Sequence, residues 1–133
     1  MRQAEERIKH AKEALKDGNY AYVIRQSQEA VELSLKASLR FIGIEPPKWQ
    51  DVGPILVQNS ERFPNWFKDK ILASISRRLR REREPSMYGD EETGLPPEQL
   101  YSLEDAKEAL DYAEEVYSLC RKLTENRQES LRF

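Results

Sequence analysis

The sequence predicts an all-α protein, an antiparallel up-and-down bundle of about five helices, four of them long or medium and one short. Charged residues make up 35% of the 133 residues and hydrophobic residues 38%, while glycine is scarce. Apolar residues recur at spacings of three and four in several long stretches, and no run of alternating apolar and β-branched residues suggests a strand. We expect one domain, residues 1–126, followed by a polar tail, residues 127–133.

Residues 19–43 predict the central helix of this bundle, because they hold a helical apolar period for longer than any other segment. Val31, Leu35 and Leu39 lie on its apolar face. Small residues alternate with them, so neighbouring helices can approach closely; these are Ser27, Ala30, Ser34, Ala37 and Ser38. Gly18 and Gly43 flank the segment and favour helix ends at both sides.

An amphipathic helix precedes the central one, with apolar residues at Ala4, Ile8, Ala11 and Leu15. The turn at residues 17–19, Asp-Gly-Asn, joins the two segments. It is so short that the second helix must return alongside the first. The sequence therefore predicts an antiparallel helical hairpin.

Two further helices are predicted between residues 51 and 85. Asp51 can cap a short helix, ahead of which we expect Trp49 to fill the edge of the core. A longer helix opens near residue 65, and its apolar stripe comprises Ile71, Leu72, Ile75 and Leu79. Pro85 ends or kinks this helix, and residues 86–99 read as an exposed loop.

The last helix has the clearest start signal, because Ser102 and Asp105 form a capping-box pattern with Asp in place of Glu. The residues that follow on one face are Leu103, Ala106, Leu110, Ala113, Val116, Tyr117, Cys120 and Leu123. We interpret Cys120 as a small buried hydrophobic residue rather than a nucleophile.

The charge pattern and the presence of a single cysteine, which cannot form a disulfide within the chain, favour a soluble, intracellular and cytoplasmic protein. The net charge is −2, so binding to nucleic acid would need a local basic patch. The amino terminus is charged throughout, and no apolar run is long enough to span a membrane. His10 is the only histidine, and we expect it to be exposed on the first helix. We therefore expect no multi-histidine metal site and no cofactor.

The strongest local feature is a cluster of arginines on the helix that ends near Pro85. Five arginines occupy residues 77–83, namely Arg77, Arg78, Arg80, Arg81 and Arg83. The planar guanidinium group suits phosphate. Alternatively, the cluster is a solvated helix face, balanced by acidic residues such as those at 90–92.

Arg83 differs from the other arginines because helical phase places it at the margin of the apolar stripe, where an unpaired charge is costly. It is the arginine that we most expect to bind an anion. Tyr88 follows the helix-ending proline, where it either packs against the bundle or donates a hydrogen bond.

The order of these features resembles that of HEPN domains (higher eukaryotes and prokaryotes nucleotide-binding), especially small stand-alone archaeal and bacterial members. Residues 27–37, SQEAVELSLKA, resemble the signature of the second helix in that family. The Gly18-Asn19-Tyr20 turn, the helix end at Gly43 and the entry into the last helix at residues 101–109 also resemble it.

This resemblance implies a dimerising helical bundle, often encoded beside a minimal nucleotidyltransferase as a toxin–antitoxin pair. Many such domains are metal-independent ribonucleases whose signature is an arginine followed four to six residues later by a histidine. No arginine of this chain's cluster is followed by a histidine; the segment after Arg83 offers Tyr88 and Asp90 instead. The usual general acid and base is therefore missing.

Three hypotheses remain open on these grounds. The first is a non-enzymatic binding module, a homodimer that docks a minimal nucleotidyltransferase or binds nucleotide or RNA phosphate through Arg77, Arg80, Arg81, Arg83 and Tyr88. The second is an atypical ribonuclease that uses Arg83, Tyr88 and Asp90, and the third is a structural scaffold. Many aromatic residues for one small bundle also suggest a dimer: Trp49, Trp66, Phe67, Tyr112 and Tyr117.

Overall fold

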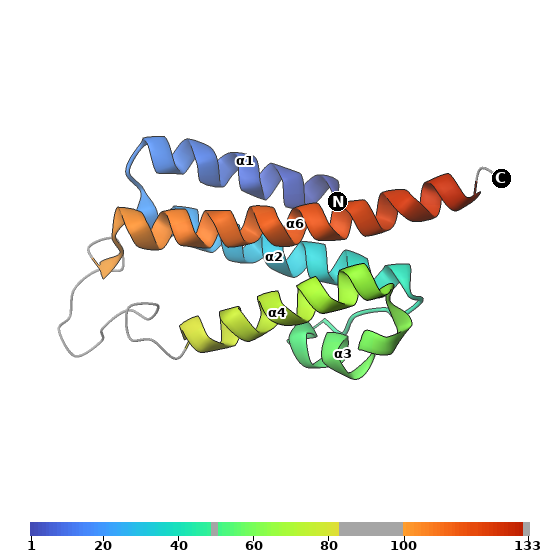
Figure 1. The fold of residues 1–133 in the computed structure, drawn as a ribbon. Coiled ribbons are helices and arrows are strands. Elements are labelled where there is room, and N and C mark those ends of the chain that lie inside the picture. Colours follow the sequence, from blue (N-terminus) through green and yellow to red (C-terminus); the bar gives the residue numbers. More distant parts are fainter. Residues whose placement is uncertain (49–50, 83–99, 132–133) are drawn as a thin grey trace.

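The computed structural model describes residues 1–48, 51–82 and 100–131, with the helix backbone alone at 78–82 and 126–131. Its helices are α1 (Arg2–Lys16), α2 (Tyr20–Phe41), α3 (Val52–Gln58), α4 (Asn65–Glu82) and α6 (Leu103–Leu131), with a 3-10 turn η1 (Ser60–Arg62). The described residues contain no strand. The prediction of an all-α bundle with four longer helices and one short helix is confirmed (Figure 1).

Helices α1 and α2 form the predicted hairpin. Gly18 adopts a positive φ of 75°, a conformation that side chains other than that of glycine rarely allow. The side chain of Asn19 then caps α2 by accepting a hydrogen bond from the backbone N–H of Tyr22 at 3.3 Å. At the far end of α2, Gly43 also has a positive φ, 85°. Both glycines therefore mark helix ends, as the sequence indicates.

Helix α2 lies at the centre of the fold, since it packs against α1 on one side and α6 on another (Figure 1). Leu35 and Leu39 are fully buried. Ser27, Ser34 and Ser38 are buried as well, which confirms that small residues let the neighbouring helices approach closely. In α1, by contrast, Ala14 is buried and Leu15 only half-buried, so the buried face is rotated slightly from the predicted one.

The segment from α3 to α4 covers one end of the bundle. Asp51 caps α3 as predicted, by accepting a hydrogen bond from the backbone N–H of Gly53 at 3.1 Å. Phe63 and Phe67 then pack against each other with ring centroids 4.8 Å apart and planes tilted by 39°, and both rings are buried. Helix α4 runs back alongside α6 in the opposite direction (Figure 1). Trp49 lies outside the described residues, so its predicted position stays a prediction.

Helix α6 begins with the predicted capping box. The Asp105 N–H donates to the Ser102 hydroxyl at 3.1 Å, and the Ser102 N–H donates to the Asp105 carboxylate at 3.0 Å. Leu103 follows the period of the predicted apolar face, but its side chain is 37% exposed, and burial on this face begins at Ala106. The helix backbone continues to Leu131, past the boundary at residue 126 that the sequence suggests.

The aromatic residues that suggested a dimer are largely used by the bundle itself. Phe67 is fully buried, and Trp66, Tyr112 and Tyr117 are partly buried against the core. They therefore give no independent reason to expect a second copy. None of the helices in the described residues is both long and apolar enough to cross a membrane.

Candidate functional site at the arginine-rich end of α4

The second half of α4 carries the arginine cluster. The helix backbone continues through Glu82, so the residues from Arg77 to Arg81 lie on consecutive turns of one helix. Arg83, Tyr88 and Asp90 lie outside the described residues, and so does the predicted loop at 86–99. The structure therefore describes the helix that precedes these residues, but not the residues themselves.

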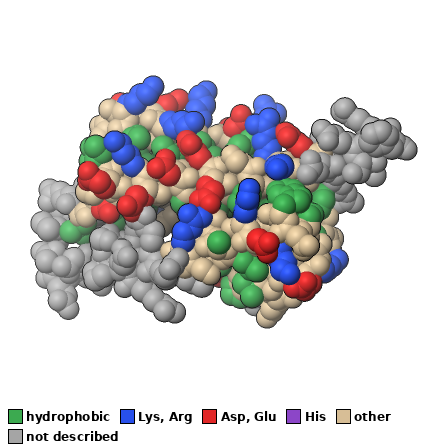
Figure 2. All heavy atoms as spheres, in the orientation of Figure 1, with side chains coloured by type: hydrophobic (Ala, Val, Ile, Leu, Met, Phe, Trp, Pro, Cys, Tyr) green, Lys and Arg blue, Asp and Glu red, His purple; other side chains and the backbone are tan. Residues whose placement is uncertain are grey.

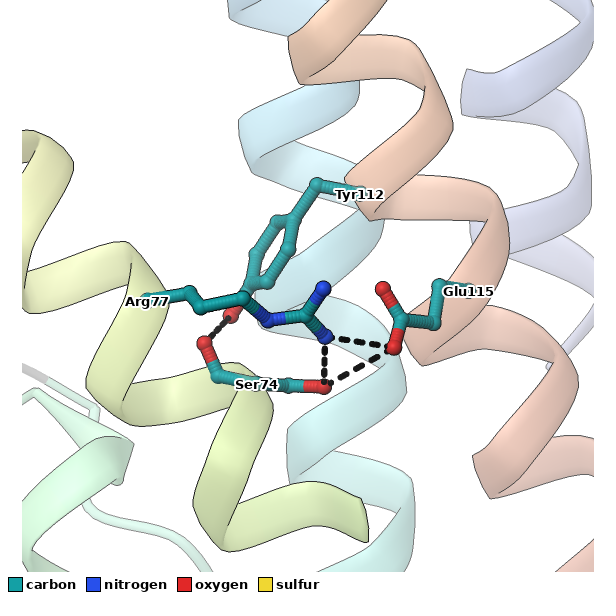
Figure 3. A network of polar contacts seen from close by, with 4 residues as sticks. All are labelled: Ser74, Arg77, Tyr112 and Glu115. Carbon is teal, nitrogen blue, oxygen red and sulfur yellow. Dashed lines mark hydrogen bonds and ion pairs between the residues drawn. The ribbon is translucent and has the colours of Figure 1, made fainter.

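Arg77 is bound within the chain. Its guanidinium Nη2 forms an ion pair with Glu115 Oε1 of α6 and donates a hydrogen bond to the Ser74 hydroxyl at 3.2 Å (Figure 3). The Arg77 side chain is about half exposed, so this pairing occurs at the edge of the core rather than inside it. Arg77 therefore joins α4 to α6, and any anion that it bound would have to compete with Glu115.

Ser74 connects this ion pair to the buried core. It has no exposed surface, and its hydroxyl lies 3.4 Å from Glu115 Oε1, to which it donates while it accepts from Arg77. The Tyr112 hydroxyl donates to the backbone carbonyl of Ser74 at 3.1 Å (Figure 3). These four residues fix the start of the arginine-rich segment against α6.

The network was not predicted from the sequence. Ser74 and Arg77 are separated from their partners Tyr112 and Glu115 by 38 to 41 positions in the sequence. Nothing in the sequence of either helix identifies that pairing. The one usable signal is the spacing of acidic residues on α6, where Glu104, Glu108, Asp111 and Glu115 share one exposed face. Helix α4 runs antiparallel to α6 (Figure 1), and Arg77 pairs with one member of this acidic face, Glu115.

Cys120 has no nucleophilic character in this setting. Its side chain is fully buried on α6, and burial raises the pKa of the thiol to about 12, although a hydrogen bond with Ser38 acts in the opposite direction. Because the reactive form is the thiolate, the interpretation of Cys120 as a core residue agrees with its surroundings.

His10 is half-buried on α1 rather than exposed as expected. It lines a groove of about 230 Å³ together with Glu13, Asp17 and Tyr22. The groove is remote in sequence from the arginine cluster. Across the residues that the structure describes, no group of three or more His, Cys, Asp or Glu side chains is arranged to hold a metal ion.

Two larger grooves cross the surface of the bundle. The groove between α1 and α6 has a volume of about 610 Å³, and the Lys12–Glu114 ion pair at 3.2 Å spans its two helices. The other groove, about 520 Å³, follows the first turns of α2 and reaches Tyr101, just before α6. Tyr22, Arg25 and Gln28 line it from α2. We call it the Tyr22 groove.

On one face of the molecule, charges are mixed rather than separated. Figure 2 shows Lys and Arg side chains interspersed with Asp and Glu side chains over α1 and α6 on one face of the molecule. Such a surface has no strong field of either sign. A phosphate-binding function therefore depends on a local excess of arginine.

The comparisons with known proteins give one match. The family model of the HEPN domain matches residues 1–123, which include all the described helices up to the last turns of α6. The comparison with curated proteins found no match, and neither did the comparison with solved structures.

Proposed function

The chain belongs to the HEPN domain family, and from this premise we propose that it is a non-enzymatic binding module. In this proposal it works in the cytoplasm as a homodimer that docks a minimal nucleotidyltransferase, binds phosphate groups of nucleotide or RNA, or does both. The anion-binding residues are Arg80, Arg81, Arg83 and Tyr88, while Arg77 anchors their helix to α6.

The observation that carries the proposal is the excess of positive charge that remains once Arg77 is paired. Glu115 neutralises Arg77 within the chain. Residues 78–83 still contain four arginines and one glutamate, in a chain whose net charge is −2. Guanidinium groups bind phosphate with two parallel hydrogen bonds, and several on successive helical turns can follow a chain of phosphates.

The lack of a histidine near these arginines supports binding without cleavage. General acid–base catalysis at neutral pH needs a group whose pKa lies near 7, and histidine is the usual one. The chain has one histidine, His10, which belongs to α1. Tyr88, with a reference pKa of about 10, is a poor general base at neutral pH.

A binding measurement tests the phosphate-binding part. Fluorescence anisotropy with labelled single-stranded RNA should give an affinity that falls steeply with salt, since bound arginines release counterions. Arg83→Ala should weaken binding more than Arg78→Ala, because helical phase places Arg78 nearer solvent. Arg83→Lys should restore the affinity only in part, because an ammonium group cannot replace the guanidinium fork. Equal affinities for all four proteins would favour the structural scaffold.

A cleavage assay separates binding from catalysis. Purified protein incubated with a mixed RNA pool and a chelator should leave the RNA intact. Cleavage that disappears in Arg83→Ala or Tyr88→Phe would overturn the proposal in favour of an atypical ribonuclease using Arg83, Tyr88 and Asp90. Co-purification with a co-expressed minimal nucleotidyltransferase, where one is encoded beside this gene, tests the docking part.

A further inference from the structure

The Tyr22 groove has a lining that differs in kind from the other described grooves. Tyr22, Arg25 and Gln28 follow each other at spacings of three along α2, and Tyr101 lines the groove from the segment that leads into α6. Ile24, which is buried, contributes an apolar surface. The groove thus combines two phenol rings, a guanidinium and the carboxamides of Asn19 and Gln28 within about 520 Å³.

The described lining of this groove carries a positive charge. Arg25 is the one charged side chain among the lining residues that the structure gives for this groove. The groove between α1 and α6, by contrast, balances Arg2, Lys9 and Lys12 against Glu5, Glu6 and Glu114. Among residues 1–48, 51–82 and 100–131, no carboxylate lines the Tyr22 groove, a setting that favours a neutral or anionic ligand.

The polar groups of α2 in this groove are available to a ligand. Tyr22 is 37% exposed, and its hydroxyl makes no hydrogen bond within the described part of the chain. Arg25 and Gln28 are exposed, and neither has an ion-pair or hydrogen-bond partner among residues 1–48, 51–82 and 100–131. At the other end of α2, by comparison, Arg40 is paired with Glu45 at 3.3 Å.

This set of groups matches the chemistry of a nucleobase. Aromatic side chains and the guanidinium plane of arginine stack on the faces of bases. A carboxamide has both a donor and an acceptor and can bind the edge of a base, while arginine can also bind the adjoining phosphate. An aliphatic or purely phosphate ligand would leave the ring of Tyr22 without a role.

The position of the groove agrees with that ligand. Helix α2 begins, α6 begins and α4 ends at the same end of the bundle (Figure 1). The Tyr22 groove and the arginine-rich segment of α4 thus belong to one end of the molecule.

We propose that the Tyr22 groove is a base-binding subsite for single-stranded RNA. Tyr22 stacks on an unpaired base, Gln28 binds the edge of that base, and Arg25 binds the adjoining phosphate. Tyr101 completes the wall from the α6 side. This inference rests on the proposed function, which identifies the ligand as RNA. The subsite itself uses residues other than the proposed anion-binding ones.

The test compares two oligonucleotides of equal length and phosphate number, one a single-stranded RNA and the other the same strand with abasic positions. Wild-type protein should bind the base-bearing strand more tightly, by about 5- to 150-fold, the range for stacking of one base. Tyr22→Ala should remove this preference and leave the affinity for the abasic strand unchanged. Tyr22→Phe should keep the preference, because it keeps the ring.

Matched variants on the same helix control for charge. Arg25→Ala and Arg40→Ala each remove one positive charge from α2, and both side chains are exposed. Only Arg25→Ala should weaken RNA binding. Far-ultraviolet circular dichroism on each variant confirms that the bundle is intact; since Tyr22 is exposed and absent from the core cluster, Tyr22→Ala should not unfold the protein.

The outcomes separate this inference from the proposed function. Equal affinity of the wild type for both strands, or a preference that survives Tyr22→Ala, overturns the base-binding subsite while leaving phosphate binding through Arg83 in place. An RNA affinity that falls in Tyr22→Ala but is unchanged in Arg83→Ala supports the subsite and overturns the arginine site. If neither strand binds, both are overturned.

Discussion

Arg77 of α4 and Glu115 of α6 form an ion pair in which the same carboxylate oxygen, Oε1, also accepts a hydrogen bond from the buried hydroxyl of Ser74. The two charged side chains are partly exposed, but the hydrogen bond from Ser74 connects their ion pair to the buried core. Because of this attachment, the first residue of the arginine cluster, Arg77, is held against α6.

The first prediction concerns this pair. A double-mutant cycle with Arg77→Ala and Glu115→Ala should give a coupling of about 0.2–1 kcal/mol, because both side chains are partly exposed. The measurement is urea unfolding of the four proteins at low and high salt, and the coupling should shrink as salt rises.

The Arg121–Glu125 pair is the control for that cycle. It lies within α6 at i,i+4 spacing, and its side chains are exposed to a similar degree. Removing it should speed amide hydrogen exchange in α6 alone. Breaking the Arg77–Glu115 pair should speed exchange in α4 as well. Amide hydrogen exchange in α4 that stays unchanged in Glu115→Ala would contradict this role.

The second prediction tests the central position of α2. Leu35→Ala or Leu39→Ala should lower the free energy of unfolding by about 2–5 kcal/mol, since both side chains are fully buried. Leu33→Ala makes the same change on the same helix at a half-buried position and should cost clearly less. Similar losses for all three variants would show that burial does not distinguish these positions.

The third prediction compares two buried serines of α2. The Ser38 hydroxyl donates to the Leu35 carbonyl at 2.7 Å, whereas the Ser34 hydroxyl has no hydrogen-bond partner among the described residues. Ser38→Ala should therefore cost about 1 kcal/mol, and Ser34→Ala should be neutral or stabilising, because it removes an unsatisfied polar group. Thermal and urea unfolding measure both. A loss in Ser34→Ala as large as that in Ser38→Ala would indicate a hydrogen bond to Ser34 in solution.

The fourth prediction concerns the thiol of Cys120. Because burial raises its pKa from an ordinary 9.0 to about 12, thiol reagents at pH 8 should modify it only after unfolding. The folded protein holds this proton to higher pH than the unfolded chain does. The thiol therefore leaves stability unchanged below pH 9 and lowers it as the pH rises from 9 toward 12. Rapid labelling of the native protein at pH 8 would contradict the burial.

The fifth prediction is the homodimer. Multi-angle light scattering should report about twice 15.6 kDa at tens of micromolar protein. The expectation comes from the family resemblance, since the described aromatic side chains pack within one copy. A monomer at that concentration would contradict it.

Local signals predicted the fold well because each acts within a few residues. The caps at Asp51 and Ser102–Asp105, and the turn at Gly18, satisfy or redirect backbone groups next to them in sequence. Leu103 has the period of the apolar face but is exposed, because helical period alone does not say where along its length a helix becomes covered. The first turn of α6 precedes the core, although it has the same period.

The candidate site was less predictable because its contacts join distant parts of the chain. Helical phase identified the arginines on α4, but the partner of Arg77 depends on which turn of α6 lies opposite. The Tyr22 groove has the same origin, since Tyr22 and Tyr101 are brought together only by the packing of α2 beside α6. Neither arrangement leaves a pattern within one helix.

The central position of α2 also determines the order in which its contacts can form during synthesis. Its contacts with α1 are close in sequence and can form as soon as both helices have left the ribosome. Its larger contact is with α6, the last helix to be made. Until α6 arrives, Leu35 and Leu39 lack part of their covering, so a nascent chain stalled before Leu103 should be prone to aggregation and degradation.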